Sequence, residues 1–258
     1  MRLGAVLLLI GLAAWLASGA LERALLYPFD PTRSPAPDAL AETMLTTPDG
    51  ETLVVWLAPP QLGKPVVLYF AGNAGSLALR AGRFSAFTAR GFGLVAAGYR
   101  GNSGSTGRPS EPALIADAQM LAEALPDLVG PAPVVYYGES LGAAVALALA
   151  ETHPPAAVVL EAPFASLAAM SDHLYGSAAP ARLLKSRWPN LDRIATLTAP
   201  LLILHGEHDA LVPPAQGRAL HAAAASPDKT FLVVPNGGHE TVWQPDAQRA
   251  LFAFLDRI

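Results

Sequence analysis

A glycine-flanked serine stands between two apolar runs near the middle of this chain, within residues 138–142. The run before it, residues 133–137, predicts a buried strand, and the alanine-rich run after it, residues 143–150, predicts a helix. Ser140 is therefore expected on a tight strand-to-helix turn, where strained backbone and close neighbours call for glycine. Such a turn lifts a serine oxygen clear of the carboxyl edge of a sheet. The short string alone also fits an ordinary turn that caps a helix.

Apolar runs alternate with helix-compatible segments along most of the chain. Because the runs are short and uninterrupted, they predict a mostly parallel central sheet with helices on both faces. The 258 residues, 52% of them hydrophobic and 15% charged, suffice for one large α/β domain or two small ones. Strands are expected at residues 51–58, 65–70, 92–97, 134–137, 156–160, 201–204 and 230–234, and helices at residues 76–90, 111–125, 214–225 and 246–257 as well as after Ser140.

The amino-terminal segment has a different character. Residues 3–21 contain no charged side chain and approach the roughly 20 apolar residues that cross a bilayer as a helix. They predict a retained membrane anchor; a secretory signal cleaved near residues 17–20 and a buried core helix are the alternatives. Arg2 favours an amino end inside the cell, which places the domain outside the cytoplasm, membrane-anchored or, after cleavage, secreted or periplasmic. We expect the anchor or signal over residues 1–21, a linker over 22–43 and the globular domain over 44–258.

Charge and residue usage exclude several functional classes. The formal net charge of −4 and the lack of a long basic run argue against nucleic acid as a partner. Cysteine is absent, so disulfides, thiolate metal sites and a cysteine nucleophile are excluded. His205 and His208 have a spacing that could suggest a metal site, but no acidic partner completes a zinc set, and no metal is expected. The sequence does not indicate an oligomeric state.

A serine hydroxyl needs a base to accept its proton and a third group to hold that base. In a parallel sheet these groups should follow the carboxyl ends of strands, in the chain order serine, acid, histidine. Asp209, after the expected strand 201–204, fits the acid better than its neighbours Glu207 and His208, because it is a short carboxylate close to a strand end. His239, after the expected strand 230–234, fits the base. The remaining histidines are interpreted as structural or surface residues: His153, His173, His205, His208 and His221.

Negative charge on a reacting carbonyl oxygen requires preorganised N–H donors. One is expected from Leu141, at the start of the helix after Ser140, where the helix dipole assists. The second is expected from Asn73 in the loop of residues 71–75, whose glycines allow close approach; an ordinary strand-to-helix turn is the alternative. Residues 163–199 form an unusually long connection between two strands, which fits either a short lid over an apolar substrate or one crossover helix with extra loop.

Taken together, residues 69–75, 99–104, 138–142, 204–209 and 237–239 resemble motifs of the α/β-hydrolase superfamily, and the resemblance extends from about residue 44 to the end. Within it, the chain resembles a membrane-anchored, short-lid subgroup related to serine aminopeptidase-like hydrolases and protein depalmitoylases. The resemblance implies an α/β-hydrolase fold, a Ser140, Asp209 and His239 triad, an oxyanion hole at Asn73 and Leu141, and no cofactor. Two positions depart from the pattern: Ala71 stands where the subgroup usually has histidine, and Gly98 where the family often has aspartate.

The expected function is a serine hydrolase that cleaves carboxylic ester or thioester bonds of a small-molecule or lipid-like acyl substrate through an acyl-enzyme. One alternative is an aminopeptidase, which needs an acidic group near the lid to hold the substrate amine; Asp172 and Asp192 are the acidic residues of that segment. Another is a catalytically silent binding protein on the same fold. Dehalogenase or epoxide hydrolase chemistry would need aspartate at position 140.

Overall fold

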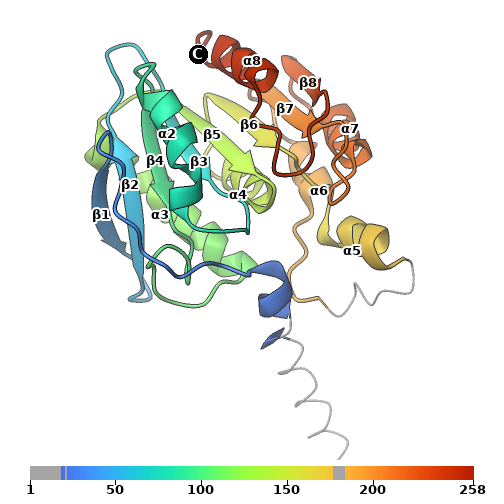
Figure 1. The fold of residues 1–258 in the computed structure, drawn as a ribbon, viewed down its shortest axis with the longest axis horizontal. Helices are drawn as coiled ribbons and strands as arrows, with labels where there is room; N and C mark the ends of the chain where they lie inside the picture. The colour runs from blue at the N-terminus through green and yellow to red at the C-terminus, as the bar shows by residue number, and fades with distance from the viewer. Residues whose placement is uncertain (1–18, 21, 177–183) are drawn as a thin grey trace, which may run out of the picture.

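The computed structural model describes residues 19–20, 22–176 and 184–258. Its centre is an eight-stranded sheet in the order β1-β2-β4-β3-β5-β6-β7-β8 (Figure 1). The first two strands are antiparallel to their neighbours, and the six from β3 to β8 run parallel. The strands are β1 (Ala41–Thr46), β2 (Thr52–Ala58), β3 (Val66–Phe70), β4 (Gly93–Ala97), β5 (Val134–Glu139), β6 (Ala157–Glu161), β7 (Leu201–Gly206) and β8 (Lys229–Val234).

Helices cover both faces of this sheet. Buried side chains of α3, α4, α6 and α7 pack with one face of the strands, and those of α2 and α8 pack with the other. The expected α/β-hydrolase architecture is therefore confirmed. The helices are η1 (Leu77–Arg80, a 3-10 turn), α2 (Ala81–Thr88), α3 (Glu111–Val129), α4 (Leu141–Ala150), α5 (Leu167–Tyr175), α6 (Asn190–Ile194), α7 (Pro214–Ala223) and α8 (Pro245–Leu255).

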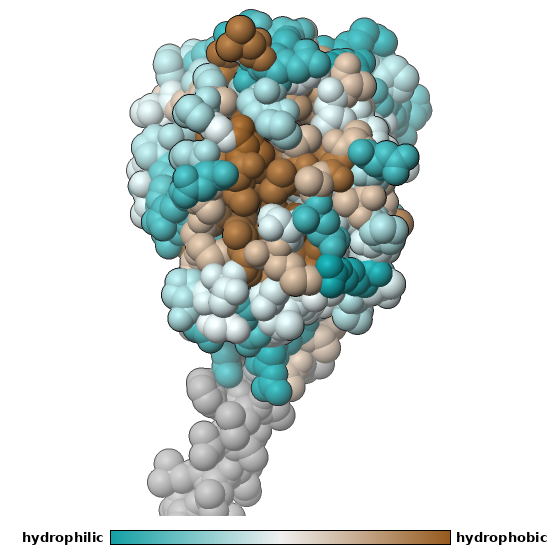
Figure 2. Space-filling model, turned by 90° about the vertical axis from the view of Figure 1, so that its left-hand side faces the viewer, coloured by the Kyte–Doolittle hydropathy of each residue, from teal (hydrophilic) through white to brown (hydrophobic). Residues whose placement is uncertain are grey.

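Strand β1 is not anticipated by the sequence analysis. Its residues alternate between exposed and half-buried because it lies at the edge of the sheet, so it lacks the apolar run that marks the inner strands. Figure 2 views the molecule from the side on which β1 and β2 lie, where a band of apolar side chains is enclosed by polar ones. Met44 on β1 and Leu62 beyond β2 are among the exposed large apolar side chains.

The expected anchor or signal lies outside the described residues except for Gly19 and Ala20. Within the described ranges, no helix combines the length and the apolar character needed to cross a bilayer. Residues 22–26 form a helical turn that leads into the domain, at the bottom of Figure 1 and on the same side of the molecule as α5.

Candidate active site

The turn between β5 and α4 is strained and tightly packed. Ser140 has φ 51° and ψ −108°, a conformation that side chains rarely adopt, and its N–H donates to the Glu161 carbonyl at 2.8 Å. A Cβ on Gly142 would lie 1.9 Å from the Phe70 carbonyl oxygen, and one on Gly138 would lie 2.4 Å from the Gly142 carbonyl oxygen. Gly142 is thus required because the turn lies directly against the end of β3, and Gly138 because it lies directly against the first turn of α4.

The three residues expected to act together lie in one hydrogen-bonded row. His239 Nε2 is 3.0 Å from Ser140 Oγ, and His239 Nδ1 is 2.8 Å from Asp209 Oδ2. An ionised carboxylate only accepts hydrogen bonds, so Nδ1 carries the proton and Nε2 is left to accept from the serine hydroxyl. The loops that hold the acid and the histidine are joined directly, since His208 N–H donates to the Gly237 carbonyl at 2.7 Å.

Asp209 is held as a charged group. Its Oδ1 accepts the backbone N–H groups of Leu211 at 3.0 Å and Val212 at 2.8 Å. Burial alone would raise the pKa of Asp209, but hydrogen bonding to His205, His239 and the Val212 amide outweighs burial and keeps this pKa well below its usual range. The carboxylate therefore stays ionised and fixes the orientation of the His239 ring.

His205 supports the same loop from beneath. It is fully buried at the end of β7, its Nε2 donates to the Val212 carbonyl at 2.8 Å, and that nitrogen is 3.5 Å from Asp209 Oδ2. Its Nδ1 has no hydrogen-bond partner among the described residues and faces Gly217, where a Cβ would approach to 2.4 Å. The ring is thus a structural support for Asp209, in keeping with its interpretation from the sequence.

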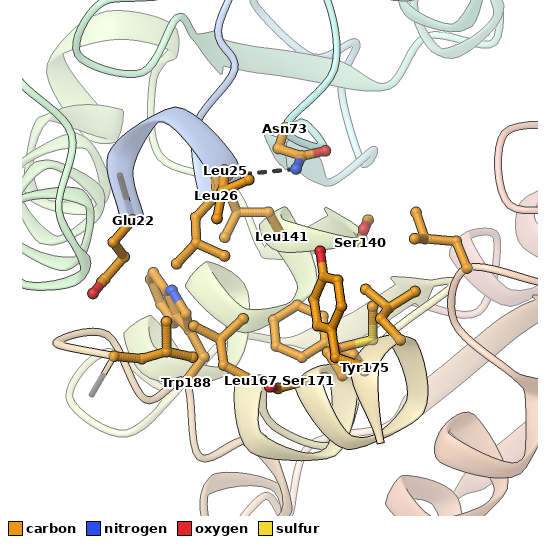
Figure 3. Close-up of a pocket in the computed structure, with 15 residues that line it drawn as sticks. Glu22, Leu25, Leu26, Asn73, Ser140, Leu141, Leu167, Ser171, Tyr175 and Trp188 are labelled. Carbon is orange, nitrogen blue, oxygen red and sulfur yellow. Dashed lines mark hydrogen bonds between the residues drawn. The ribbon is translucent and has the colours of Figure 1, made fainter. Parts of the chain in front are cut away.

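The residues expected as oxyanion donors lie near the serine. Leu141 is the first residue of α4, and Asn73 lies in the loop after β3; both line the same cavity as Ser140 (Figure 3). The Asn73 side-chain amide nitrogen donates to the Leu26 carbonyl at 3.4 Å. This leaves backbone N–H groups, rather than the amide side chain, as the donors that the geometry offers.

One cavity beside Ser140 is apolar. It has a volume of about 230 Å³ and lies between the serine, helix α5 and the helical turn of residues 22–26 (Figure 3). Trp188 and Leu167 form its inner wall, and Leu25 and Tyr175 stand nearer to solvent. The other lining residues are Glu22, Leu26, Asn73, Leu141, Phe164, Met170, Ser171, Leu174, Leu184 and Leu211.

A second cavity, of about 310 Å³, also reaches Ser140 and shares Asn73 and Leu211 with the first; we call it the polar cavity because several charged side chains line it. Arg80, Arg83, Glu139 and Glu240 line it together with His239. Among the described residues, His239 lines this second cavity and not the apolar one. Ser140 thus lines both the apolar and the polar cavity, and the His239 imidazole faces the polar one.

A family model described as serine aminopeptidase, S33, matches residues 63–193 and 189–246, which together span well over half of the chain. The chain belongs to this family of α/β hydrolases. An uncharacterized protein of Mycobacterium tuberculosis is 39% identical over 246 residues, which cover 89% of this chain and 86% of that protein.

Two further likenesses are more distant. The lysophosphatidylserine lipase ABHD12 of Danio rerio is 32% identical over 185 residues, 64% of this chain and 48% of its own length. Among solved structures, the esterase Pf2001 of Pyrococcus furiosus superposes with a TM-score of 0.72 at 18% identity, covering 89% of this chain and 97% of the esterase. At that identity the esterase supports the fold alone.

In this S33-family chain, a buried ion pair connects the serine turn to the Asn73 loop. Arg80 donates to Glu139 through Nη2 at 2.8 Å and Nε at 3.1 Å, and its Nη1 donates to the Ala74 carbonyl. Burial would raise the pKa of Glu139, but the guanidinium groups of Arg80 and Arg83 outweigh burial and hold this pKa below its usual range. Arg80 therefore links the residue before Ser140 to the residue after Asn73.

A second pair lies beneath the first. Arg83 donates to Glu161 at 2.7 Å, and the Tyr137 hydroxyl donates to the same carboxylate. The backbone carbonyl of Glu161 accepts the Ser140 N–H, so this pair also supports the serine turn. Neither pair is predicted from the sequence. A usable signal exists: a carboxylate ends each of two otherwise apolar strands, and two arginines lie three residues apart on the expected helix 76–90.

The two departures from the family pattern have local explanations. The Ala71 carbonyl accepts the Tyr99 hydroxyl at 2.9 Å, so the Asn73 loop is braced by Tyr99 and Arg80 without a histidine at position 71. At Gly98, a Cβ would lie 2.8 Å from the Asn102 carbonyl oxygen and from Ser103 Cβ. Aspartate would not fit there in this chain.

Proposed function

We propose that this S33-family protein is a membrane-anchored serine hydrolase that cleaves carboxylic ester or thioester bonds through an acyl-enzyme intermediate. The observation that carries the proposal is the row from Ser140 Oγ through His239 to Asp209, with separations of 3.0 and 2.8 Å, opening on an apolar cavity. Nucleophile, base and orienting acid are each within hydrogen-bond reach of the next.

The groups of the site take part in the reaction in turn. Ser140 Oγ attacks the acyl carbon while His239 Nε2 takes the hydroxyl proton, and ionised Asp209 stabilises the imidazolium. The backbone N–H groups of Leu141 and Asn73 hold the oxyanion of the tetrahedral intermediate. His239 then gives its proton to the departing alcohol or thiol, leaving the acyl group on Ser140, and water activated by the same imidazole releases the acid.

The two cavities indicate how the substrate lies in the site. Since His239 must protonate the leaving group, the leaving group departs on the side that His239 faces, the polar cavity. The acyl group then occupies the apolar cavity, beside α5. A substrate with an apolar acyl chain on a polar alcohol or thiol fits this division, and the lipase name of the Danio rerio relative is compatible with it.

A serine-directed fluorophosphonate probe tests the nucleophile. We expect the full-length protein in detergent to be labelled and Ser140→Ala to remain unlabelled. Ser171→Ala is the matched control, because Ser171 lines the same cavity but lies on α5, away from the strained turn. Equal labelling of wild type and Ser140→Ala would overturn the assignment of Ser140 as the nucleophile. A wild type that is not labelled at all would favour a silent binding protein on this fold.

The family description keeps an aminopeptidase as the second candidate. A peptidase of this kind needs an uncompensated carboxylate beside the substrate amine. Of the described residues that line the apolar cavity, only Glu22 is acidic, and its carboxylate already accepts two backbone N–H groups. Asp172 and Asp192 do not line the cavity. Comparing acyl esters and thioesters with aminoacyl amides of equal size separates the two functions; faster amide cleavage would favour the peptidase.

The membrane part of the proposal rests on the uncharged stretch of residues 3–21. We propose that it is a retained anchor that holds the domain outside the cytoplasm, with a secreted or periplasmic form after signal cleavage as the alternative. Alkaline extraction of membranes and the mass of the mature amino terminus distinguish them. A protein that begins near residue 21 and leaves the membrane on extraction would support cleavage.

A further inference from the structure

Exposed apolar side chains gather at the rim of the apolar cavity. Eight large hydrophobic side chains are exposed among the described residues, and four of them line this one cavity: Leu25, Leu174, Tyr175 and Leu211, with exposed fractions between 42% and 69%. Single exposed apolar side chains are ordinary on a protein surface, whereas a group around one opening indicates a binding surface. We call these four residues the rim.

The rim is joined to the end of the uncharged amino-terminal stretch. Glu22, the first charged residue after that stretch, is buried, and its carboxylate accepts the backbone N–H groups of Lys185 at 2.6 Å and Ser186 at 2.8 Å. The Tyr27 hydroxyl lies 3.2 Å from Ser186 Oγ. These contacts fix residues 22–27 against the segment that follows α5, so Leu25 keeps its place at the rim (Figure 3).

The same region includes the last described residues of the stretch. A Cβ on Gly19 would lie 2.6 Å from Lys185 Nζ, so Gly19 also packs beside this segment. From Leu21 to Leu25 the chain spans at most about 14 Å even when fully extended. A bilayer that holds residues 3–21 must therefore lie within that distance of Leu25, one of the four rim residues.

We propose that the rim rests on the lipid surface and that acyl chains pass from the bilayer directly into the apolar cavity. The inference rests on the proposed function for its anchor and its reaction. The partner that covers the rim is lipid, because the three leucines offer apolar surface and a tyrosine suits the boundary between hydrocarbon and water. The polar cavity, which His239 lines, would then receive the leaving group.

Contact with lipid is measured without catalysis. The chain contains no cysteine, so a single introduced cysteine carries one polarity-sensitive fluorophore. Full-length Leu174→Cys in a Ser140→Ala background is reconstituted into phosphatidylcholine vesicles with and without spin-labelled lipid. We expect a blue-shifted emission and at least twofold quenching by the spin label. Leu62→Cys, equally apolar and fully exposed, is the control and should show neither effect.

Three results would overturn the inference. One is the absence of quenching at position 174, and another is equal quenching at positions 174 and 62. The third is emission that follows protein density in the vesicle rather than spin-labelled lipid, because a second copy of the chain would then cover the rim.

Activity gives a second readout. For Leu25→Gln with Tyr175→Gln, we expect hydrolysis of a long-chain ester in vesicles to fall at least tenfold more than hydrolysis of a water-soluble short-chain ester. Met44→Gln with Leu62→Gln should change neither rate. Equal losses on both substrates would contradict entry from the bilayer. If wild type cleaves neither ester, the hydrolase proposal fails, while the fluorescence result still decides whether the rim contacts lipid.

Discussion

Arg80 and Glu139 form a two-point ion pair directly beside the proposed nucleophile, with nitrogen–oxygen distances of 2.8 and 3.1 Å. Because Arg80 also donates to the Ala74 carbonyl, one buried guanidinium fixes the serine turn relative to the Asn73 loop. The two backbone donors of the proposed oxyanion hole belong to these two segments. Their relative position therefore depends on the Arg80 side chain.

Replacing Arg80 tests this dependence. Arg80→Lys keeps the charge but cannot make the forked contact with Glu139 and the bond to Ala74 together. We expect kcat to fall about 10- to 100-fold, less than the loss of a whole oxyanion donor, with little change in KM. Arg249→Lys on the exposed face of α8 is the control. A change in thermal stability with unaltered kcat would make Arg80 a purely structural residue.

The glycines of the turn between β5 and α4 offer a second test. In Gly142→Ala the new methyl group would collide with the backbone carbonyl of Phe70, which cannot move without displacing β3. We expect a loss of at least about 3 kcal/mol in the free energy of unfolding, or no folded protein. Gly82→Ala is the matched control in α2, where a Cβ meets nothing within 4 Å, and it should stabilise the protein by up to about 1 kcal/mol. Denaturant unfolding measures both; similar effects of the two changes would refute the steric argument.

The sequence allows Ser140, Asp209 and His239 to be predicted together for a topological reason. The carboxyl ends of parallel strands meet at one edge of a sheet, so residues after β5, β7 and β8 converge although they are far apart in the chain. Each also follows an apolar run, which reveals the strand end. Whether the three roles are catalytic is decided by the labelling experiment.

Other parts of the site depend on contacts that local sequence patterns do not encode. Arg80 and Glu139 are 59 residues apart, and Glu22 and Lys185 are 163 apart; neither pair is marked by spacing or by a motif. Residues 22–43 are expected to be a linker, yet Glu22, Leu25 and Leu26 line the apolar cavity. That role depends on the packing of residues 22–27 against residues 184–188, which only the folded chain brings together.

Replacement of His205 and of His208, two histidines of one short motif, should change the free energy of unfolding by very different amounts. His205 is fully buried beneath Asp209, whereas the His208 side chain is 66% exposed. His205→Ala leaves a buried cavity and an unpaired Val212 carbonyl, so we expect a loss of about 2–4 kcal/mol in the free energy of unfolding and a lower kcat. His208→Ala should change stability by less than about 0.5 kcal/mol. Urea titrations of both variants measure this, and equal effects would contradict the support assigned to His205.

The lowered pKa of Asp209 makes a prediction about acid stability. A carboxylate whose pKa is lower in the folded than in the unfolded state contributes stability above the unfolded value, near 3.9, and loses it as the pH falls towards the folded value. The difference in unfolding free energy between wild type and Asp209→Asn should therefore shrink as the pH falls below about pH 4.

Urea unfolding at a series of pH values measures this difference. Asp246→Asn, in an exposed pair with Arg249, is the control and should differ little from wild type at any of these pH values. A difference for Asp209→Asn that grows as the pH falls below about pH 4 would mean that the folded protein favours the protonated acid. In that case Asp209 could not hold the His239 ring in the tautomer that accepts the Ser140 proton.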